Sequence, residues 1–466
     1  ALAKIEAHDE RRGLSALLGS IHRTSPNPFF ASGVGADEKN TSVNVLYVAQ
    51  SGLGMGNRDY YFDESSAHIR TAYEAFIEKI MALAGYTAEE CERIAASVLK
   101  IERSLAEAHF TNVEKRNPHK NYNKLSLAQL RKEFRNIDWD AYAEAMGFEM
   151  PAELVVSQRP ALKRANHIIG KENLRVIKDY LLFHEVRSAS NYLSDDFTAA
   201  NFDFYGRTLS GSEQQRPRWK RALAVADGNL SEAVGKKYVE KFFPAEYKEK
   251  MLAIVANLQM ALGKHIDALD WMSDVTKAKA HEKLAAFTVK IGYPDTWEEY
   301  ATLAIDPAKS YLENVREVSG WHTADNLAQL GKPVDRAKWL MSPQTVNAYY
   351  NPTTNEICFP AAILQPPFFN PEADDAVNYG AIGVVIGHEM THGFDDQGRQ
   401  YDKDGNLNDW WTKEDAEAFD KRAEILVAQF DAIEVNKEGL HANGQFTLGE
   451  NIADQGGLRV AMTALR

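Results

Sequence analysis

The chain has 466 residues, of which 44% are hydrophobic and 26% are charged, and its net charge is −13. This balance excludes a disordered or fibrous chain and predicts two or three globular domains with sizeable cores. It also argues against nucleic acid and anionic membranes as partners, because both attract clustered Lys and Arg.

No apolar run approaches the roughly 18 residues needed to cross a bilayer. The sequence starts directly in a charged helical pattern, without a signal peptide. Two cysteines, Cys91 and Cys358, are too few for a disulfide framework, and each is expected to be a small buried hydrophobic residue. We therefore expect no transmembrane segment in this chain.

The first stretch predicts a helix, a strand and a turn. Residues 1–23 have the apolar spacing of an amphipathic helix, which Ser25–Pro28 would end. Val43–Ala49 is typical of a short strand. The glycines of 52–56 are spaced G-x-G-x-G, which does not fit a dinucleotide-binding loop, so we expect a turn there. Together these elements form an expected N-terminal segment, residues 1–64.

Apolar residues recur at helical spacing through most of the next 220 or so residues, between clusters of Pro, Gly and Asn. No internal repeat of a solenoid type is present. We expect a mainly helical domain over residues 65–284, with helices at 66–84, 88–109, 126–135, 171–193, 245–271 and 274–284.

The pattern becomes mixed after residue 284. Lys338–Tyr350 and Glu356–Ile363 are rich in β-branched and aromatic residues and predict two strands joined by a turn. Asp402–Asn406 resembles a calcium-binding loop, but its glycine is at the fourth position rather than the sixth, so we expect a hairpin-like turn. The predicted fold class is mainly α with a smaller β part (α+β), with residues 285–466 as the last domain.

One short stretch contains the pattern H-E-x-x-H, formed by His388, Glu389 and His392. On a helix the two histidines lie about 40° apart on one face, so they can hold one metal ion. Glu389 points about 100° away from His388, outside the ligand set but within reach of a water on the same ion. The alternative is a structural histidine pair that binds no metal.

A second carboxylate motif follows downstream. Glu450 and Asp454 are four residues apart, so they share one face of a short helix. Two histidines and Glu450 would make the three-ligand set of a catalytic zinc site, and Asp454 could accept the free ring N–H of His388. The pair Asp395–Asp396 could do the same for His392 or could simply cap that helix. Without the H-E-x-x-H pattern, Glu450 and Asp454 would be interpreted as an ordinary solvated helix face.

Four segments carry a resemblance to a known family: G-H-E-M-T-H-G-F-D-D at 387–396, L-G-E-N-I-A-D at 448–454, V-N-A-Y-Y at 346–350 and F-P-A-A-I-L-Q-P-P-F-F at 359–369. In these segments, and in shorter ones reaching back to residue 57, the chain resembles the neprilysin and endothelin-converting-enzyme family of zinc endopeptidases. With only two cysteines it is similar to bacterial-type, oligopeptidase O-like members.

This resemblance implies a thermolysin-like zinc catalytic domain at 285–466 and a large helical domain that encloses the active-site chamber and admits short peptides. One Zn²⁺ per chain would be bound by His388, His392 and Glu450. Glu389 would act as the general base on a water at the ion, and Asp454 would support catalysis. The implied activity is that of an endopeptidase that prefers a bulky hydrophobic residue just after the cut bond.

The family likeness also implies substrate contacts. Asn347 and Ala348 would hold the substrate backbone as an added edge strand. The pocket for the hydrophobic substrate side chain would be lined by Ile363, Phe368, Val384 and Val385. Without the family likeness, Asn347 and Ala348 would be interpreted as part of an ordinary edge strand, and the four apolar residues as core positions.

In the resembled family, an oxyanion-stabilising histidine and a substrate-binding arginine follow the E-N-I-A-D segment, and this sequence stops at Arg466. We therefore expect a fragment that a missing C-terminal segment completes, either in the same chain or as a separate one. Residues 1–466 alone are expected to bind zinc and to lose most peptidase activity.

The expected partners are peptide substrates and that C-terminal segment. The expected location is extracytoplasmic (bacterial periplasm, cell surface or secreted), with the cytoplasm as the alternative. Two other functions remain open. One is a peptide-binding protein that keeps zinc without turnover, and the other is an aminopeptidase, for which no acidic motif upstream of H-E-x-x-H is evident.

Overall fold

A computed structural model describes residues 2–24, 27–436 and 439–466. Within these ranges the chain is mainly helical with a small amount of strand, which confirms the predicted fold class. Ala1 lies outside the described residues, and so do Ser25 and Pro26, which belong to the segment predicted to end the first helix. The chain divides into two compact units: the first is Ala1–Gly35, Asn44–Val225 and Tyr300–Pro333, and the second is Ala36–Val43, Ala226–Glu299 and Val334–Arg466.

The first unit contains a sheet with strand order β1-β2-β4-β3. The tip of the β1–β2 hairpin, Ala36–Val43, is assigned to the second unit. Strand β2 runs parallel to β4, and β3 is antiparallel to β4. After its first residue β4 is fully buried, as expected for a strand covered on both faces. The strand predicted at Val43–Ala49 is confirmed within β2. The bounds are β1 Phe30–Asp37, β2 Asn40–Gln50, β3 Lys124–Ser126 and β4 Glu153–Val156.

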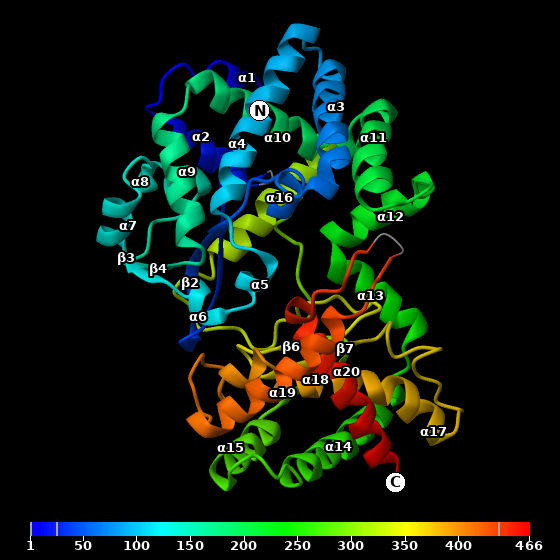
Figure 1. The fold of residues 1–466 in the computed structure, drawn as a ribbon. Helices are drawn as coiled ribbons and strands as arrows, with labels where there is room; N and C mark the ends of the chain where they lie inside the picture. Colours follow the sequence, from blue (N-terminus) through cyan, green and yellow to red (C-terminus); the bar gives the residue numbers. More distant parts are fainter. Residues whose placement is uncertain (1, 25–26, 437–438) are drawn as a thin grey trace. The chain divides into compact units, whose positions relative to one another are not determined.

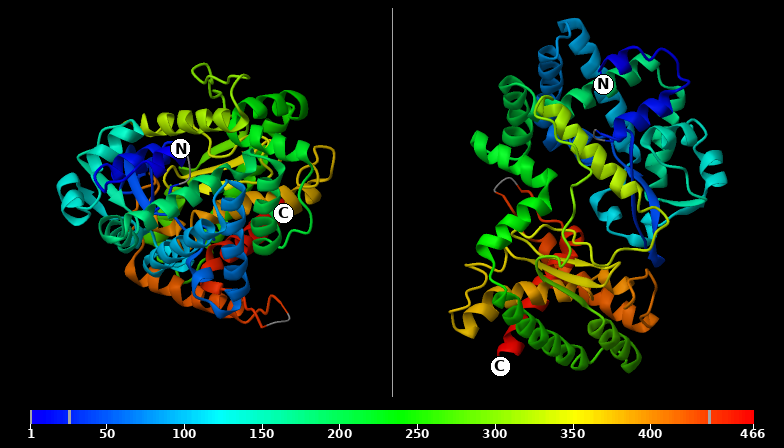
Figure 2. Two further views of the ribbon diagram at one scale, coloured as in Figure 1. Left: turned by 90° about the horizontal axis from the view of Figure 1, so that it is seen from above. Right: turned by 180° about the vertical axis from the view of Figure 1, so that it is seen from behind.

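Helices make up most of the rest of this unit (Figure 1). Helix α16 reaches β1 near its C-terminal end, where the Asn326 side chain exchanges two 2.9 Å hydrogen bonds with the backbone of Val34 (Figure 2). The bounds are α1 Leu2–Glu6, α2 Leu14–His22, η1 Arg58–Tyr61, η2 Glu64–Ser66, α3 Ala67–Leu83, α4 Ala88–Ala108, α5 Asn112–Lys115, α6 Pro118–Asn121, α7 Leu127–Glu133, α8 Trp139–Met146, α9 Arg159–Lys171, α10 Leu174–Ala189, η3 Ser190–Tyr192, α11 Asp195–Asn201, the π-helical η4 Phe202–Leu209, α16 Tyr311–Leu327 and α12 Arg218–Asn229, which continues into the second unit after Val225.

Local sequence signals explain where several helices begin. Helix α4 starts at a capping box, in which the side chains of Thr87 and Glu90 each accept the backbone N–H of the other. The predicted helices at 66–84 and 88–109 are confirmed as α3 and α4. The single helix predicted over residues 1–23 is wrong: α1 ends at Glu6, and α2 begins only after Gly13, whose φ of +86° is incompatible with a right-handed helix.

A buried polar cluster lies in the core of the first unit. The carboxylate of Glu102 is fully buried and accepts hydrogen bonds from Tyr61, Tyr73 and His184 at 2.6, 3.0 and 2.8 Å. These donors compensate for burying the carboxylate. His184 is therefore a core histidine, although His184 and Glu185 match the first two residues of the H-E-x-x-H pattern.

The second unit contains a sheet with strand order β5-β7-β6. Strand β5 (Thr288–Gly292) is parallel to β7 (Glu356–Pro360), and β6 (Tyr349–Asn351) is antiparallel to β7 at the sheet edge. The strand predicted at 356–363 is confirmed over its first five residues.

The strand predicted at Lys338–Tyr350 is wrong over most of its length. Only its last two residues belong to β6. Pro343 explains the difference, since proline cannot donate to a strand ladder. Instead, the N–H of Thr345 bonds the carbonyl of Ser342 at 3.0 Å and closes a turn.

The other elements of the second unit are helical. Helix α20 packs against α18, α14 and α19, and His265 of α14 hydrogen-bonds Thr463 of α20 at 2.8 Å. The predicted helices at 245–271 and 274–284 are confirmed as α14 and α15. The bounds are α13 Ser231–Phe242, α14 Glu246–Asp267, α15 Asp274–Ala285, α17 Asp375–Asn378, the π-helical η5 Tyr379–Gly383, α18 Val384–His392, η6 Gly398–Gln400, α19 Lys413–Asp431 and α20 Gly444–Leu465.

The two compact units differ from the expected domain ranges 1–64, 65–284 and 285–466. Helices α13 to α15 belong to the second unit, although they lie in the predicted helical domain, and α16 belongs to the first. Hydrophobic periodicity identifies an amphipathic helix but does not identify the core against which its apolar face packs.

The predicted turn at Asp402–Asn406 is present. Asp402 accepts the backbone N–H groups of Asp404 and Asn406 at 3.0 Å each, and Tyr401 pairs with Leu407 across the turn. The Asp402 carboxylate is therefore used to hold the backbone of its own loop.

The two cysteines and the apolar segments fit the sequence expectations. Cys91 and Cys358 are both buried free thiols. Among the helices described, none combines the length and the apolar character that crossing a bilayer requires.

Asp415 links the N-termini of α15 and α19 and yields a stability prediction. Its carboxylate accepts the backbone N–H and hydroxyl of Ser273 at 3.0 and 2.5 Å. Burial opposes its ionisation, but hydrogen bonds from Ser273, Thr276 and Thr412 outweigh burial and lower the pKa of Asp415 to about 2.

Asp415→Asn should lower the free energy of unfolding at pH 7 by about 2 kcal/mol, the typical value for hydrogen bonds to a charged group. Because the folded pKa lies below the usual 3.8, this stabilisation is present above pH 4 and lost as pH falls toward 2. Urea denaturation at pH 7, 4 and 3 measures the difference. Glu417→Gln, an exposed change on α19, is the control; an equal loss in both variants would contradict the prediction.

Candidate metal centre

The H-E-x-x-H segment forms most of α18, which continues directly from η5. Helix α18 lies beside α20, although about 50 residues separate them in sequence (Figure 1). Helix α20 starts at Asn443, whose side chain accepts the N–H of Phe446 at 2.8 Å. The pairing places the downstream carboxylates beside the histidines.

Glycines allow α18 and α20 to approach closely. A Cβ atom on Gly457 would lie 2.5 Å from the carbonyl oxygen of Val384 and 2.7 Å from the backbone nitrogen of His388. A Cβ on Gly387 would lie 2.9 Å from the Cα of Gly457. Real side chains do not tolerate such distances, so this helix crossing requires glycine.

The three predicted ligands meet beside this crossing. His388 Nε2 and His392 Nε2 are 3.0 Å apart, and Glu450 Oε2 lies 3.3 and 3.5 Å from them. Ligand atoms at about 2.0–2.1 Å from a tetrahedral zinc ion would be about 3.3 Å apart. Of the residues described, this is the only cluster of three or more His, Cys, Asp or Glu groups spaced to hold a metal ion.

Each histidine is held from behind by a carboxylate. His388 Nδ1 is 2.9 Å from Asp454 Oδ1, and His392 Nδ1 is 2.7 Å from Asp395 Oδ2. An Nδ1–H donated to a carboxylate leaves the Nε2 lone pair free in the neutral ring. At 3.0 Å the two Nε2 atoms are bridged either by a proton or by a metal ion, and with Glu450 beside them these residues fit a zinc ion.

The pKa values of these side chains reflect the same contacts. Burial opposes protonation of both histidines, but hydrogen bonds to carboxylates outweigh it and raise the pKa of His392 to about 10 and that of His388 above its usual value. Hydrogen bonds with the two histidines lower the pKa of Glu450. Without a metal ion this cluster retains protons, and a divalent cation must displace them.

Glu389 lies outside the group of ligand atoms. It is 7% exposed, and burial raises the pKa of its carboxyl group, while His392 and His388 oppose that shift. The backbone of Tyr350 hydrogen-bonds this carboxylate. A raised pKa in a partly dry site is typical of a proton-transfer group.

A hollow of about 380 Å³ opens beside the cluster. Its wall includes His388, Glu389, His392 and Glu450, together with Asn347 and Ala348 from the segment that leads into β6. The hollow therefore joins the metal cluster to a sheet edge.

The four residues expected to form the pocket for a hydrophobic substrate side chain do not line this hollow. Ile363 is buried, and Phe368, Val384 and Val385 are partly buried in the apolar cluster of the second unit. None of the four is among the residues that line the hollow. Their role in a substrate pocket stays a prediction.

Sequence reasoning left some of the site unassigned. The contact between Asp395 and His392 was one of two options, because an aspartate three residues beyond a histidine is equally typical of a helix cap. Tyr350 acts through its backbone, which no residue pattern reveals. Lys283 donates to the turn behind His392 from more than 100 residues away, and no local signal marks it.

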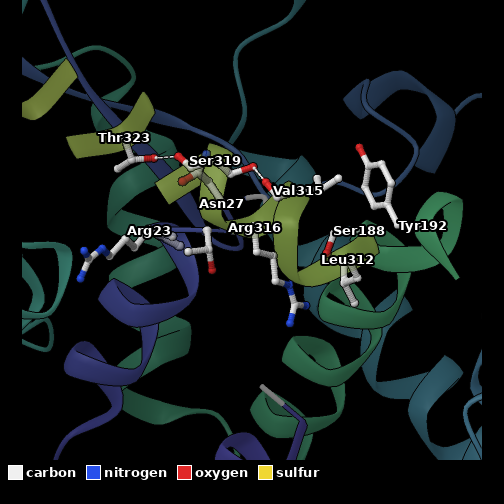
Figure 3. Close-up of a pocket in the computed structure, with 11 residues that line it drawn as sticks. Arg23, Asn27, Ser188, Tyr192, Leu312, Val315, Arg316, Ser319 and Thr323 are labelled. Carbon is white, nitrogen blue, oxygen red and sulfur yellow. Dashed lines mark hydrogen bonds between the residues drawn. The ribbon is translucent and has the colours of Figure 1, made fainter. Parts of the chain in front are cut away.

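A second hollow lies in the first unit (Figure 3). Its arginines do not converge, since Arg23 and Arg316 point in different directions and Arg316 pairs with Glu185. His22, also in its wall, is engaged by Tyr142 and the Pro28 carbonyl, and burial lowers its pKa to about 4. This hollow has no chemistry comparable to that of the metal cluster.

An H-E-x-x-H helix, a glutamate from a second helix and a carboxylate behind each histidine define the site of the zinc metallopeptidases. Sequence profiles agree at both ends of the chain: the N-terminal and C-terminal profiles of Peptidase family M13 match residues 1–294 and 347–466. The chain belongs to Peptidase family M13.

Curated relatives and solved structures support this membership. The chain is 35% identical to neprilysin-11 of Caenorhabditis elegans, over 97% of the chain and 56% of that protein. It is 34% identical to human endothelin-converting enzyme 1, over 98% of the chain and 60% of that protein. The chain thus spans less than two thirds of the length of these relatives.

Two bacterial structures cover the whole chain. The Mycobacterium tuberculosis zinc metalloprotease ZMP1 in complex with an inhibitor is 40% identical, with a TM-score of 0.96, and the match spans 71% of it. PEPO from Lactobacillus rhamnosis is 28% identical, with a TM-score of 0.92 and 74% of its chain matched. A bacterial-type member of the family fits both likenesses.

Asp454→Ala should weaken zinc binding about 10- to 100-fold, as the loss of a carboxylate behind a metal-ligating histidine typically does. The reason is that His388 loses the partner of its Nδ1. Competition with a chromogenic chelator measures the dissociation constant. Glu424→Ala, an exposed carboxylate on α19, should leave it unchanged. An unchanged affinity of Asp454→Ala would make this aspartate a plain surface residue.

Gly457→Ala should destabilise the protein by about 1–3 kcal/mol, the usual cost of overpacking, and weaken zinc binding. The new methyl group forces α18 away from α20 and Glu450 away from the histidines. Gly380→Ala, where a Cβ meets open space, is the matched control. Alanine favours a helix over glycine by up to about 1 kcal/mol, so a stabilised Gly457→Ala variant would refute the close crossing.

Proposed function

We propose that this chain forms the catalytic centre of a zinc-dependent endopeptidase that hydrolyses peptide bonds of short peptides. The observation that carries the proposal is the pair of facing Nε2 atoms, 3.0 Å apart, with Glu450 beside them and Glu389 held outside the ligand set. One zinc ion per chain would bind to His388, His392 and Glu450.

The chain's own residues divide the work of hydrolysis. When bound, zinc polarises the scissile carbonyl and makes water more acidic. Glu389 takes the proton of the attacking water on its carboxylate and passes that proton to the leaving amine. Its raised pKa favours holding the proton between these two transfers. Asp454 and Asp395 keep the two histidine rings oriented toward the hollow.

The substrate backbone would pair with the edge of the β5-β7-β6 sheet. Among the described strands, β6 pairs with β7 alone, and Asn347 and Ala348 lead into β6 along the wall of the hollow. Main-chain hydrogen bonds to such an edge bind any extended peptide, whatever its side chains. This arrangement suits an enzyme that cleaves many short peptides.

The proposed function includes a substrate preference. A bulky hydrophobic residue just after the cut bond would enter a pocket formed by Ile363, Phe368, Val384 and Val385. The support is their shared membership of one apolar cluster that also includes residues of α18. An extracytoplasmic location stays a prediction.

Glu389→Gln in the whole protein should lower kcat/KM on a fluorogenic peptide by at least about 100-fold, the usual contribution of a general base. Zinc content should remain one per chain, because Glu389 is not a ligand. The matched control is Glu282→Gln, since His281–Glu282 is also a His-Glu pair on a helix but lacks the second histidine. Full activity of Glu389→Gln would overturn the assignment of the base. Zinc and peptide binding without cleavage in the unmutated protein would instead indicate a binding protein.

A further inference from the structure

Lys283 of α15 is a buried cation close to the metal centre. It is 1% exposed, and its Nζ lies 5.8–5.9 Å from the ring centres of Tyr350, Phe394 and Trp410. Burying an ammonium group is unfavourable unless specific partners compensate for lost hydration. A lysine at this position therefore requires an explanation beyond packing.

Its amine holds both ends of the η6 turn. Lys283 Nζ donates to the carbonyl oxygens of Gly398 and Tyr401 at 2.6 and 2.7 Å. Both oxygens also accept other hydrogen bonds, from the Tyr401 N–H at 3.1 Å and from the Trp410 indole at 2.9 Å. Both carbonyl groups would therefore keep a hydrogen-bond donor if the lysine were absent. The need to pair these two backbone groups does not explain why a lysine is buried here.

The η6 turn also holds the carboxylate behind His392. Asp395 Oδ1 accepts the backbone N–H groups of Gln397 and Gly398 at 2.9 and 2.7 Å, and Oδ2 bonds His392. Gly398 is therefore held on two sides, through its N–H by Asp395 and through its carbonyl by Lys283. A Cβ on Gly398 would lie 1.7 Å from the His392 carbonyl oxygen, so the turn folds tightly back on the ligand helix.

Charge couples the same groups. Asp395 is 3% exposed, and Asp395 and Asp402 favour the protonated lysine. Burial acts in the opposite direction and lowers the pKa of Lys283 to about 7. Since a neutral amine still has two N–H donors, both carbonyl contacts persist on either side of that pKa.

We propose that Lys283 is a positioning residue of the metal centre, which fixes the Asp395–Tyr401 turn and thereby the orientation of His392. The lysine touches neither the metal ligands nor the hollow. It acts on zinc affinity through Gly398 and Asp395, so that three successive hydrogen bonds connect Lys283 to His392. The inference rests on the proposed zinc binding by His388, His392 and Glu450.

Lys283→Met tests the proposal in the full chain. We expect zinc affinity to fall by about 10-fold, the lower end of the range for groups behind metal ligands, because Asp395 loses its fixed position and a neighbouring charge. The visible absorption of the cobalt-substituted protein should also change, since it reports ligand geometry. Chelator competition gives the zinc dissociation constant for each variant.

Lys290→Met is the matched control. Lys290 is also a buried lysine of the second unit, but it donates to the Lys338 carbonyl and pairs with Glu356, each at 2.8 Å. Its replacement should affect stability while leaving zinc affinity and the cobalt spectrum unchanged. Equal losses of zinc affinity in Lys283→Met and Lys290→Met would mean that any buried lysine matters, and would overturn the proposal.

A double-mutant cycle with Asp395→Asn gives the decisive comparison. If Lys283 acts through Asp395, adding Lys283→Met to Asp395→Asn should change zinc affinity less than twofold. Additive losses would overturn the proposal. If Lys283→Met does not fold, as judged by circular dichroism, the cycle uses Lys283→Gln, which keeps a donor and loses the charge. Absence of zinc binding in the unmutated chain would instead overturn the proposed function.

Discussion

The close crossing of α18 and α20 is the constraint on which the metal centre depends. Gly387 and Gly457 leave no room for a Cβ atom between the two helices, so the backbones approach more closely than side chains would allow. This approach brings Glu450 within 3.5 Å of both histidines and Asp454 behind one of them. Because both helices are packed in a core, the ligand atoms are positioned by rigid elements rather than by a loop.

The site contains several buried polar and charged groups that would destabilise the fold at most other positions. Two imidazoles with facing lone pairs, a buried Glu389 and a buried Asp395 lie within one region of the second unit. Such groups destabilise a fold unless a cation or hydrogen bonds compensate for them. The carboxylates behind the histidines supply part of this compensation, and a metal ion would supply the rest. Metal binding and folding of this region are therefore expected to be coupled.

The support extends beyond the direct partners of the histidines. Asn355, with φ +49°, donates to the carbonyls of Lys283 and Lys403 at 3.1 and 3.2 Å and accepts from the hydroxyl of Tyr350. It therefore links α15, the Asp402 turn and strand β6. The wall of the hollow and the turn behind His392 share this framework, so strand β6 and the cluster of His388, His392 and Glu450 keep a fixed relation.

The sequence by itself determined the chemistry of the site and many of the helices. The spacing of His388, Glu389 and His392 follows from helix geometry alone, and helices such as α3 and α4 follow from periodicity and caps. The tertiary structure decided which residues meet: that Asp395 rather than its neighbour holds His392, that Lys283 reaches the same turn, and that α13 to α15 pack in the second unit. Local patterns reflect the short-range backbone and packing preferences of neighbouring residues. Contacts between residues a hundred positions apart depend on how whole elements pack, and no local pattern encodes that.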